Sequence, residues 1–364
     1  MAKIKALLLG DAMIPSGGFS AAWDKYLSPF GDVGFAGDWE PSWDKLQFRR
    51  LEVEKKGPEI ENADPLVLAH GRDCSLLAGL FIPVSSKVIE AMPALRIVGA
   101  SRAGLENVNV EKATERGILV FNVMGRNAHA VSDFAVGMMI AECRNIARAH
   151  YAIKKGEWRK TFSNNDNIPE LGGKTVGLVG FGFIGSLVAK KLSGFDVKVL
   201  VHDPYADPAR IRAAGCVPAG LEELFRTSDF ISLHARLTDD NKKMINAGLI
   251  SLMKPTAYLI NTSRAGLVDQ DALAAALSAK KIQGAALDVF NTEPVPADSP
   301  FLALDNVTLT SHLAGTTSDA LTNSPFLLME DIAKFLSGKD ARYIVNREVL
   351  DRPDFREWLQ TVKG

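Results

Sequence analysis

Short apolar runs alternate with stretches of helical periodicity along most of this chain. Such alternation is typical of an α/β protein with a parallel sheet. In the first part of the chain we expect strands at Ile4–Leu9, Pro65–Leu68, Leu95–Gly99 and Leu119–Phe121. A second series predicts strands at Thr175–Val179, Val197–Val201, Phe230–Leu233, Ala257–Asn261, Ala285–Val289 and Val307–Thr310. Residues 10–62 are rich in Gly, Pro, Trp and acidic residues, and their pattern assigns no element.

Two segments have the apolar spacing of long helices. Between Ala128 and about Lys155, residues such as Val131, Met138 and Ile146 recur at helical spacing, so we expect one continuous helix. It carries more apolar positions than one core face needs, which indicates a subunit interface. The second helix is expected over residues 319–336.

The composition is that of an ordinary globular protein. Of the 364 residues, 47% are hydrophobic and 23% are charged, and at about 150 residues per domain this length favours two domains. The 42 basic residues are balanced by 43 acidic ones, so we expect no nucleic-acid partner. The N-terminal apolar stretch is too short for a signal peptide, and no apolar run reaches the ~20 residues of a membrane helix. We therefore expect a cytoplasmic protein without membrane attachment.

The cysteines do not indicate a metal centre. Cys74, Cys143 and Cys216 are too few and too scattered for a disulfide framework or a zinc cluster. No neighbouring base marks any of them as a nucleophile, so we interpret them as structural and expect no metal.

A dinucleotide-binding motif lies at the start of the second series. The segment Gly180–Gly185 reads GFGFIG and fits G-x-G-x-x-G between a predicted strand and a predicted helix. We expect Gly180 to permit the tight turn, Gly182 to let the backbone approach the pyrophosphate, and Gly185 to let helix and strand pack closely. Phe183 and Ile184 begin the helix, whose free N–H groups favour phosphate.

Asp203 follows the next predicted strand, about 20 residues beyond the glycines, where an acidic residue binds the adenosine ribose. Its carboxylate would repel a 2′-phosphate, so NAD is favoured over NADP. Other dinucleotide or adenosyl cofactors remain open on the motif alone.

Three polar side chains follow neighbouring strands of the second series. Arg264, Glu293 and His312 are expected at the carboxyl edge of the sheet, where open α/β sheets bind ligands. Arginine can hold a carboxylate, histidine can exchange a proton near neutral pH, and a nearby glutamate favours imidazolium. This trio suits hydride transfer to a carboxylated carbonyl. His234 and Thr262, also at strand ends, are expected to contact the cofactor.

From about Leu95 to Thr317 the sequence resembles the D-isomer-specific 2-hydroxyacid dehydrogenases. This family includes D-3-phosphoglycerate, D-lactate, glycerate and formate dehydrogenases. The matching segments are the cofactor loop 177–185, the ribose site 202–204, the arginine signature 253–269, the glutamate signature 286–294 and the histidine signature 311–315.

The resemblance implies a role for each matching residue. Arg264 would bind the substrate carboxylate and carbonyl, and His312 would be the acid–base residue, supported by Glu293. Asp288 would bind the nicotinamide carboxamide. The segment 101–108 resembles the loop whose backbone N–H groups hold the substrate carboxylate, which places Arg102, Ala103 and Gly104 in the substrate site.

The resemblance also implies the architecture. We expect two doubly wound parallel-sheet α/β domains with a cleft between them that closes on substrate. Residues 1–124 and 318–364 would form a discontinuous, flavodoxin-like substrate domain. Residues 125–317 would form a Rossmann domain that binds NAD. The family resemblance likewise implies a homodimer.

Some positions depart from the family pattern. Arg102 stands where many members have glycine, Arg236 where many have proline, and residues 70–82 look like an unusually long loop. These departures leave the substrate open. A phosphorylated substrate would need extra cations, for which Arg72, Arg102 and Arg236 are candidates. Formate dehydrogenases have glutamine in place of Glu293, which argues against formate.

The function expected from the sequence is NAD-dependent hydride transfer between nicotinamide and a D-2-hydroxy acid or 2-keto acid. The alternative is an NAD-sensing regulatory or co-repressor protein on the same scaffold, because some relatives with that role keep the catalytic trio. A fold relative acting on an amino acid or nucleoside is a third possibility, disfavoured by the arginine and histidine signatures.

Overall fold

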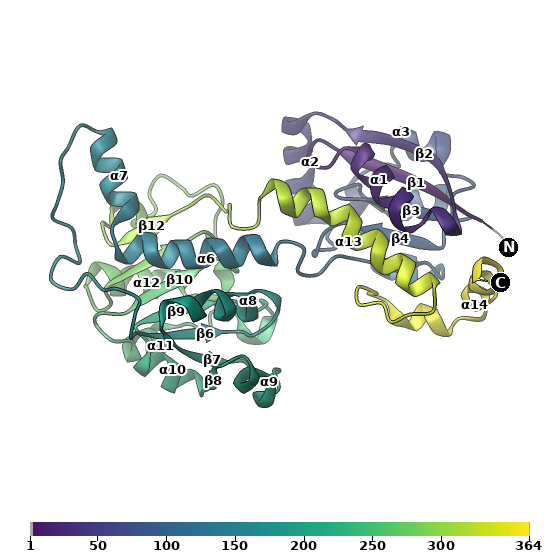
Figure 1. Ribbon diagram of the computed structural model, residues 1–364. Coiled ribbons are helices and arrows are strands. Elements are labelled where there is room, and N and C mark those ends of the chain that lie inside the picture. Colours follow the sequence, from purple (N-terminus) through teal and green to yellow (C-terminus); the bar gives the residue numbers. More distant parts are fainter. Residues whose placement is uncertain (1–2, 364) are drawn as a thin grey trace. The chain divides into compact units, whose positions relative to one another are not determined.

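The computed structural model describes residues 3–363, which divide into two compact units (Figure 1). Residues 3–126 and 317–363 make up the first, called the terminal unit here, and residues 127–316 make up the second, called the central unit. Each unit is built around a parallel sheet. This confirms the predicted α/β class with two parallel-sheet domains.

The terminal unit has a five-stranded parallel sheet in the order β2-β1-β3-β4-β5. Its strands are β1 (Ile4–Asp11), β2 (Gly31–Glu40), β3 (Leu76–Gly79), β4 (Ile97–Ala100) and β5 (Leu119–Phe121). This is the flavodoxin-like order, in which the direction of winding reverses between β1 and β3. Almost every residue of β1, β3, β4 and β5 is buried, as expected for a parallel sheet covered on both faces.

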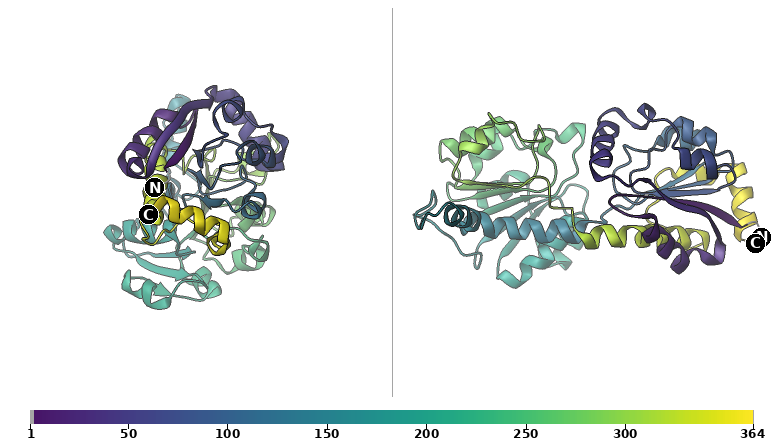
Figure 2. Two further views of the ribbon diagram at one scale, coloured as in Figure 1. Left: turned by 90° about the vertical axis from the view of Figure 1, so that its right-hand side faces the viewer. Right: turned by 90° about the horizontal axis from the view of Figure 1, so that it is seen from above.

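The helices of the terminal unit come from both ends of the chain. They are α1 (Ser16–Tyr26), α2 (Trp43–Lys56), α3 (Pro65–His70), α4 (Ser86–Ala91), α5 (Val110–Glu115), α13 (Ser318–Leu336) and α14 (Pro353–Lys363). Helix α13 packs beside α1, as Figures 1 and 2 both show. Gly99 of β4 lets α13 approach the sheet, because a Cβ there would lie 2.9 Å from Leu328.

Several expectations for the terminal unit were wrong. Residues 65–68 form part of α3 and not a strand, because Pro65 starts a helix that Asp64 caps by accepting the Leu66 N–H at 2.9 Å. Strands β2 and β3 were not predicted, and β3 lies within residues 70–82, which are therefore not a long loop. Strand β4 begins two residues later than expected.

The central unit has a seven-stranded parallel sheet in the order β12-β11-β10-β9-β6-β7-β8. Its strands are β6 (Thr175–Val179), β7 (Lys198–His202), β8 (Val217–Pro218), β9 (Phe230–Leu233), β10 (Tyr258–Asn261), β11 (Gly284–Leu287) and β12 (Val307–Leu309). From β8 to β11 this is the Rossmann order, with β12 added at the edge. Every strand predicted for this series is present, and the short β8 is an addition.

The helices of the central unit are α6 (Ala128–Cys143), α7 (Ile146–Lys154), α8 (Phe183–Leu192), α9 (Pro208–Ala213), α10 (Leu221–Thr227), α11 (Ala247–Leu252) and α12 (Gln270–Ser278). The single helix predicted from Ala128 to Lys155 was wrong, because Asn145 adopts a left-handed conformation with φ of 59° and separates α6 from α7. Its side chain is held by Arg148 and Asn164, at 2.9 and 2.8 Å.

Short 3₁₀ helices occupy several connections in both units: Ser28–Phe30, Pro58–Ile60, Ser193–Phe195, Asp239–Asn241, Ala265–Leu267, Pro300–Ala303 and Arg347–Asp351. Among the helices of residues 3–363, none combines the length and apolarity needed to cross a membrane.

Candidate active site

The glycine-rich loop leaves β6 and opens α8. Gly180 has φ of 102°, and a Cβ on it would lie 2.6 Å from the backbone nitrogen of Ala235. A Cβ on Gly185 would lie 2.1 Å from the Gly180 carbonyl oxygen, whereas one on Gly182 would meet nothing within 4 Å. Close backbone contacts therefore require the first and third glycines, and the second leaves the loop surface open.

The start of α8 is available to an anion. No side chain caps this helix, and Phe183 at its first position is exposed while Ile184 is half-buried. Uncapped N–H groups at a helix N-terminus attract phosphate through hydrogen bonding and the helix dipole.

Asp203 lies beside this loop, directly after β7. One carboxylate oxygen accepts the Phe181 N–H at 2.6 Å, and the other accepts the Tyr205 N–H at 2.9 Å. The half-buried carboxylate is thereby fixed next to the glycines and keeps further lone pairs for a ligand.

Two other predicted cofactor residues present buried polar atoms without partners. His234 follows β9, and neither of its ring nitrogens has a hydrogen-bond partner within residues 3–363. Burial lowers the pKa of His234 to about 4, so the ring is neutral. The hydroxyl of Thr262, which follows β10, is likewise unpartnered in the described chain. Because buried polar atoms are nearly always hydrogen-bonded, these groups fit a ligand that supplies partners.

Glu293 and His312 lie on the loops that follow the neighbouring strands β11 and β12, close enough to form an ion pair. Nδ1 of His312 lies 2.8 Å from Oε2 of Glu293, and both side chains are partly exposed. The other carboxylate oxygen of Glu293 accepts the Phe290 N–H at 2.9 Å. The carboxylate is thus fixed by the backbone and in turn orients the imidazole.

Asp288 holds the His312 loop in place. This fully buried carboxylate accepts the Thr310 hydroxyl at 2.6 Å and the Leu313 and Ala314 N–H groups at 2.8 and 2.9 Å. His312 between them has φ of 57°, a left-handed conformation that is uncommon for a residue other than glycine. Hydrogen bonds on both sides therefore stabilise a strained backbone. The contact of Asp288 with nicotinamide stays a prediction.

Arg264 presents an exposed guanidinium. Its Nη1 donates to the Ser263 carbonyl at 2.8 Å, and its own carbonyl accepts from the Asn261 side chain at 3.1 Å. Within residues 3–363, no hydrogen bond or ion pair joins Arg264 to His312 or Glu293. Most of its donors remain free for an anion.

The predicted carboxylate loop lies in the terminal unit, after β4. The carbonyl of Arg102 accepts the Val123 N–H at 2.9 Å, and that of Ala103 accepts from Asn122 at 2.7 Å. In the described chain, the backbone N–H groups of Arg102, Ala103 and Gly104 make no hydrogen bond. The Arg102 side chain, by contrast, is paired with local acids. The other two candidate cations, Arg72 and Arg236, are exposed.

Comparison with known proteins identifies the family to which this chain belongs. Residues 136–314 match the NAD-binding domain of the D-isomer-specific 2-hydroxyacid dehydrogenases. A glyoxylate reductase of Korarchaeum cryptofilum is 36% identical over 302 residues, covering 82% of this chain and 91% of that protein. The chain belongs to the D-isomer-specific 2-hydroxyacid dehydrogenases.

Other members of the family differ from this chain in length. A D-3-phosphoglycerate dehydrogenase of Methanocaldococcus jannaschii is 38% identical over 298 residues, which cover 81% of this chain and 54% of that protein. The chain therefore spans about half the length of such relatives. The solved structure of a D-2-hydroxyisocaproate dehydrogenase superposes with a TM-score of 0.73 at 23% identity, covering 94% of this chain and 100% of that one, and supports the fold.

The cofactor of this family member is NAD, because its central unit contains the family's NAD-binding domain. The loop geometry fits that cofactor: the cradle at Gly180 and Gly185 has no room for side chains, and the surface at Gly182 is open. Asp203 would bind the adenosine ribose, and the start of α8 would bind the pyrophosphate. The buried polar atoms of His234 and Thr262 would gain hydrogen-bond partners. Within residues 3–363, no group of three metal-ligating side chains could hold a metal ion.

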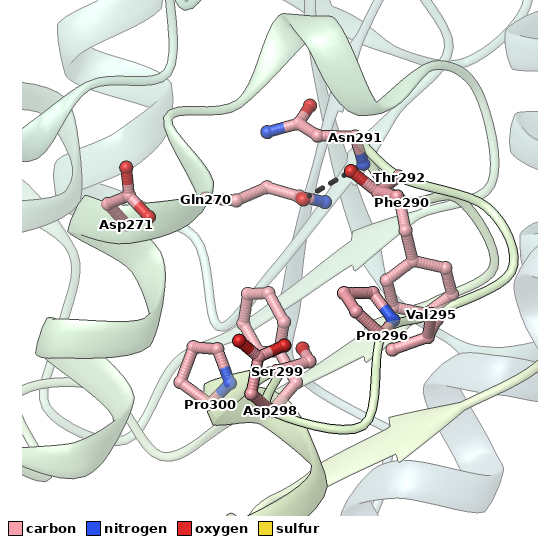
Figure 3. Close-up of a pocket in the computed structure, with 11 residues that line it drawn as sticks. Gln270, Asp271, Phe290, Asn291, Thr292, Val295, Pro296, Asp298, Ser299 and Pro300 are labelled. Carbon is pink, nitrogen blue, oxygen red and sulfur yellow. Dashed lines mark hydrogen bonds between the residues drawn. The ribbon is translucent and has the colours of Figure 1, made fainter.

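The loop that carries Glu293 has a tether that the sequence analysis missed. Gln270, the first residue of α12, accepts the Asn291 N–H at 3.1 Å and donates to the Val289 carbonyl at 3.3 Å. Figure 3 shows the bond between Gln270 and Asn291. Both residues help to line a pocket of about 250 Å³ between the loop and α12. The partners of Gln270 lie 19 and 21 residues away, so no local pattern marks it.

Proposed function

We propose that this chain reduces 2-oxo acids with NADH and, in reverse, oxidises D-2-hydroxy acids with NAD. The observation that carries the proposal is the His312–Glu293 pair at 2.8 Å, held on the loops that follow β12 and β11 of an NAD-binding sheet. Such a pair supplies a proton donor and acceptor where ligands of open α/β sheets bind.

The proposed roles of the central unit follow from its hydrogen bonds. NAD, when bound, supplies or accepts the hydride. Glu293 accepts from Nδ1 of His312, so the proton on Nε2 is the one free to pass to the substrate carbonyl oxygen. In the oxidative direction, neutral Nε2 would accept the hydroxyl proton. Asp288 and Gln270 would act as positioning residues, since they fix the two loops.

Arg264 is proposed to bind the substrate carboxylate and to stabilise the negative charge that develops on the carbonyl oxygen. The planar fork of arginine can contact both oxygens, and most of its donors are unused by the protein. In the terminal unit, the unpaired N–H groups of residues 102–104 are proposed to bind a carboxylate.

The test is NADH oxidation, followed at 340 nm with a panel of 2-oxo acids that includes glyoxylate and hydroxypyruvate. We expect turnover by the unmodified protein and a loss of about 10²-fold or more in kcat for His312→Ala. NADH binding, measured by fluorescence titration, should be retained in that variant. Normal turnover by His312→Ala would refute the assignment. NADH binding without turnover of any 2-oxo acid would favour the regulatory alternative.

A further inference from the structure

Three arginines gather at the carboxyl edge of the terminal sheet. Arg102 follows β4, Arg126 lies five residues beyond the end of β5, and Arg50 of α2 reaches the ring of Phe81 at the same edge. The guanidinium groups of Arg50 and Arg102 lie over the ring of Phe81, 5.5 and 4.6 Å from its centre. Phe81 itself follows β3, next to the point between β1 and β3 where the winding of the sheet reverses. Ligands of flavodoxin-like sheets bind at that point.

The charge of Arg102 is balanced within the terminal unit. Its Nη2 lies 2.8 Å from Glu54 and 3.2 Å from Glu106, and Nη1 donates to Asn107 at 3.4 Å. Arg102 therefore has little free capacity for a ligand, although its sequence position first suggested it as an extra cation.

Arg50 and Arg126 are in the opposite situation. Within residues 3–363 neither side chain has an ion-pair or hydrogen-bond partner, and Nε of Arg50 and Nη1 of Arg126 are both buried. Glu54, one helical turn after Arg50, is the residue that pairs with Arg102. The adjacent Arg49 shows the usual arrangement, with Glu40 at 3.2 Å and Glu61 at 2.9 Å.

Within residues 3–363, the carboxylate that acts to raise the pKa of Arg126 is that of Asp11, at the end of β1, and it is a poor counter-charge. Its oxygens accept the N–H groups of Met13, Ile14 and Phe81 at 2.9, 3.1 and 3.2 Å, and burial raises its pKa. Burial and the neighbouring Arg102 lower the pKa of Arg126 to about 10, which leaves it charged at neutral pH. Burying guanidinium N–H groups without partners costs free energy that an anion would recover.

We propose that Arg50 and Arg126 form a second anion subsite that selects 2-oxo acids carrying a second oxyanion, either a phosphate or a carboxylate. The subsite adjoins the loop proposed to bind the first carboxylate, because residues 122 and 123 bond directly to the carbonyls of Arg102 and Ala103. The substrate part of this inference rests on the proposed function.

Steady-state kinetics of Arg50→Gln and Arg126→Gln test the subsite. The substrates are glyoxylate, which has no second anion, 3-phosphohydroxypyruvate and 2-oxoglutarate. We expect KM for the doubly anionic substrate to rise about tenfold more than KM for glyoxylate. The phosphate and carboxylate arms identify which oxyanion is preferred. Arg116→Gln removes an exposed arginine whose side chain has no partner in the described part of the terminal unit, and it should leave all three KM values unchanged. Equal effects on all three substrates would overturn the subsite.

Thermal unfolding with inorganic phosphate, at ionic strength matched with NaCl, provides a second readout that needs no turnover. Phosphate should raise the Tm of the unmodified protein and of Arg116→Gln, but not that of Arg50→Gln or Arg126→Gln. Without phosphate, Arg126→Gln should keep or raise the Tm, because an unpaired buried charge is removed. If phosphate changed the Tm of Arg50→Gln and Arg126→Gln as much as that of the unmodified protein, or changed none of them, the subsite would be overturned. If no 2-oxo acid is turned over, the proposed function fails, whereas the phosphate titration still decides whether the anion subsite exists.

Discussion

At the scale of single residues, some polar groups of the candidate site are fully hydrogen-bonded within the protein, and others have no partner there. Asp288 accepts three hydrogen bonds from one loop, whereas the ring of His234 has no partner in the described chain. Groups that are fully bonded fix the geometry, and buried groups without partners are where a ligand gains most.

Asp203 gives a prediction on cofactor choice. Its carboxylate, fixed by two backbone N–H groups, should bind the ribose hydroxyls and repel a 2′-phosphate. We expect NADH to outperform NADPH strongly. Asp203→Ala should weaken NADH binding by about 1.5–3 kcal/mol, the value of a charged hydrogen bond, and should relax the preference. Titration of both cofactors with both proteins measures this, and equal affinity of the unmodified protein for NADH and NADPH would contradict it.

His234 gives a prediction on pH. Its pKa falls from 6.5 to about 4 on burial, so the unfolded chain binds a proton more readily than the folded one. Stability is therefore fully present above pH 6.5 and decreases as the pH falls toward 4, by up to about 3 kcal/mol. His234→Gln should flatten the dependence of the free energy of unfolding on pH over this range. The free energy of unfolding is measured by urea titration at several pH values between 7 and 4.5. If it fell as steeply with falling pH in His234→Gln as in the unmodified protein, the prediction would be contradicted.

At the scale of elements, a buried ion pair anchors the break between α6 and α7. Arg148 binds the carboxylate of Glu142 and donates to the Asp305 carbonyl, and the second Glu142 oxygen accepts the Thr308 hydroxyl at 2.6 Å. Both side chains are almost fully buried. The pair therefore links the two helices to β12, at the far edge of the sheet.

Breaking this pair should be costly. Arg148→Met leaves the buried Glu142 carboxylate without its counter-ion, so we expect a loss of about 3–5 kcal/mol in the free energy of unfolding. The double variant Glu142→Leu with Arg148→Met removes both charges and should recover much of the loss. Urea unfolding of both variants decides the matter. If the single and double variants lost the same stability, packing rather than the unpaired charge would be responsible.

At the scale of the whole molecule, α7 presents an apolar surface. Arg148 and Ala152 are its buried residues, while Ile146, Tyr151 and Ile153 are exposed by 53, 65 and 56%. Ile146 and Ile153, which are seven residues apart, lie on the same face of this short amphipathic helix, and an exposed apolar face can mark an interaction site. Together with the family membership, it supports the proposal that this helix contributes to a homodimer interface.

Light scattering tests that proposal. We expect a dimer at micromolar concentration, and Ile153→Glu should shift the mass toward the monomer, because a charge would be buried at the interface. Lys160→Glu, a change of charge at an exposed position outside this helix, serves as a control for electrostatic effects. A monomeric unmodified protein would reject the interface.

The sequence by itself determined the α/β class, every strand of the central unit except the short β8, the cofactor loop and the residues proposed for catalysis. These signals are local: a strand, a glycine turn and a helix, or a polar residue directly after an apolar run. The tertiary structure decided what depends on partners far apart in the chain. Arg102 is paired with Glu54, 48 residues away, while Arg50 and Arg126 have no ion-pair partner within residues 3–363. Strand β3 and helix α3 are both short and apolar, so periodicity alone could not tell them apart. The Asp64 cap and Pro65 make residues 65–70 a helix, and burial between β1 and β4 makes residues 76–79 a strand.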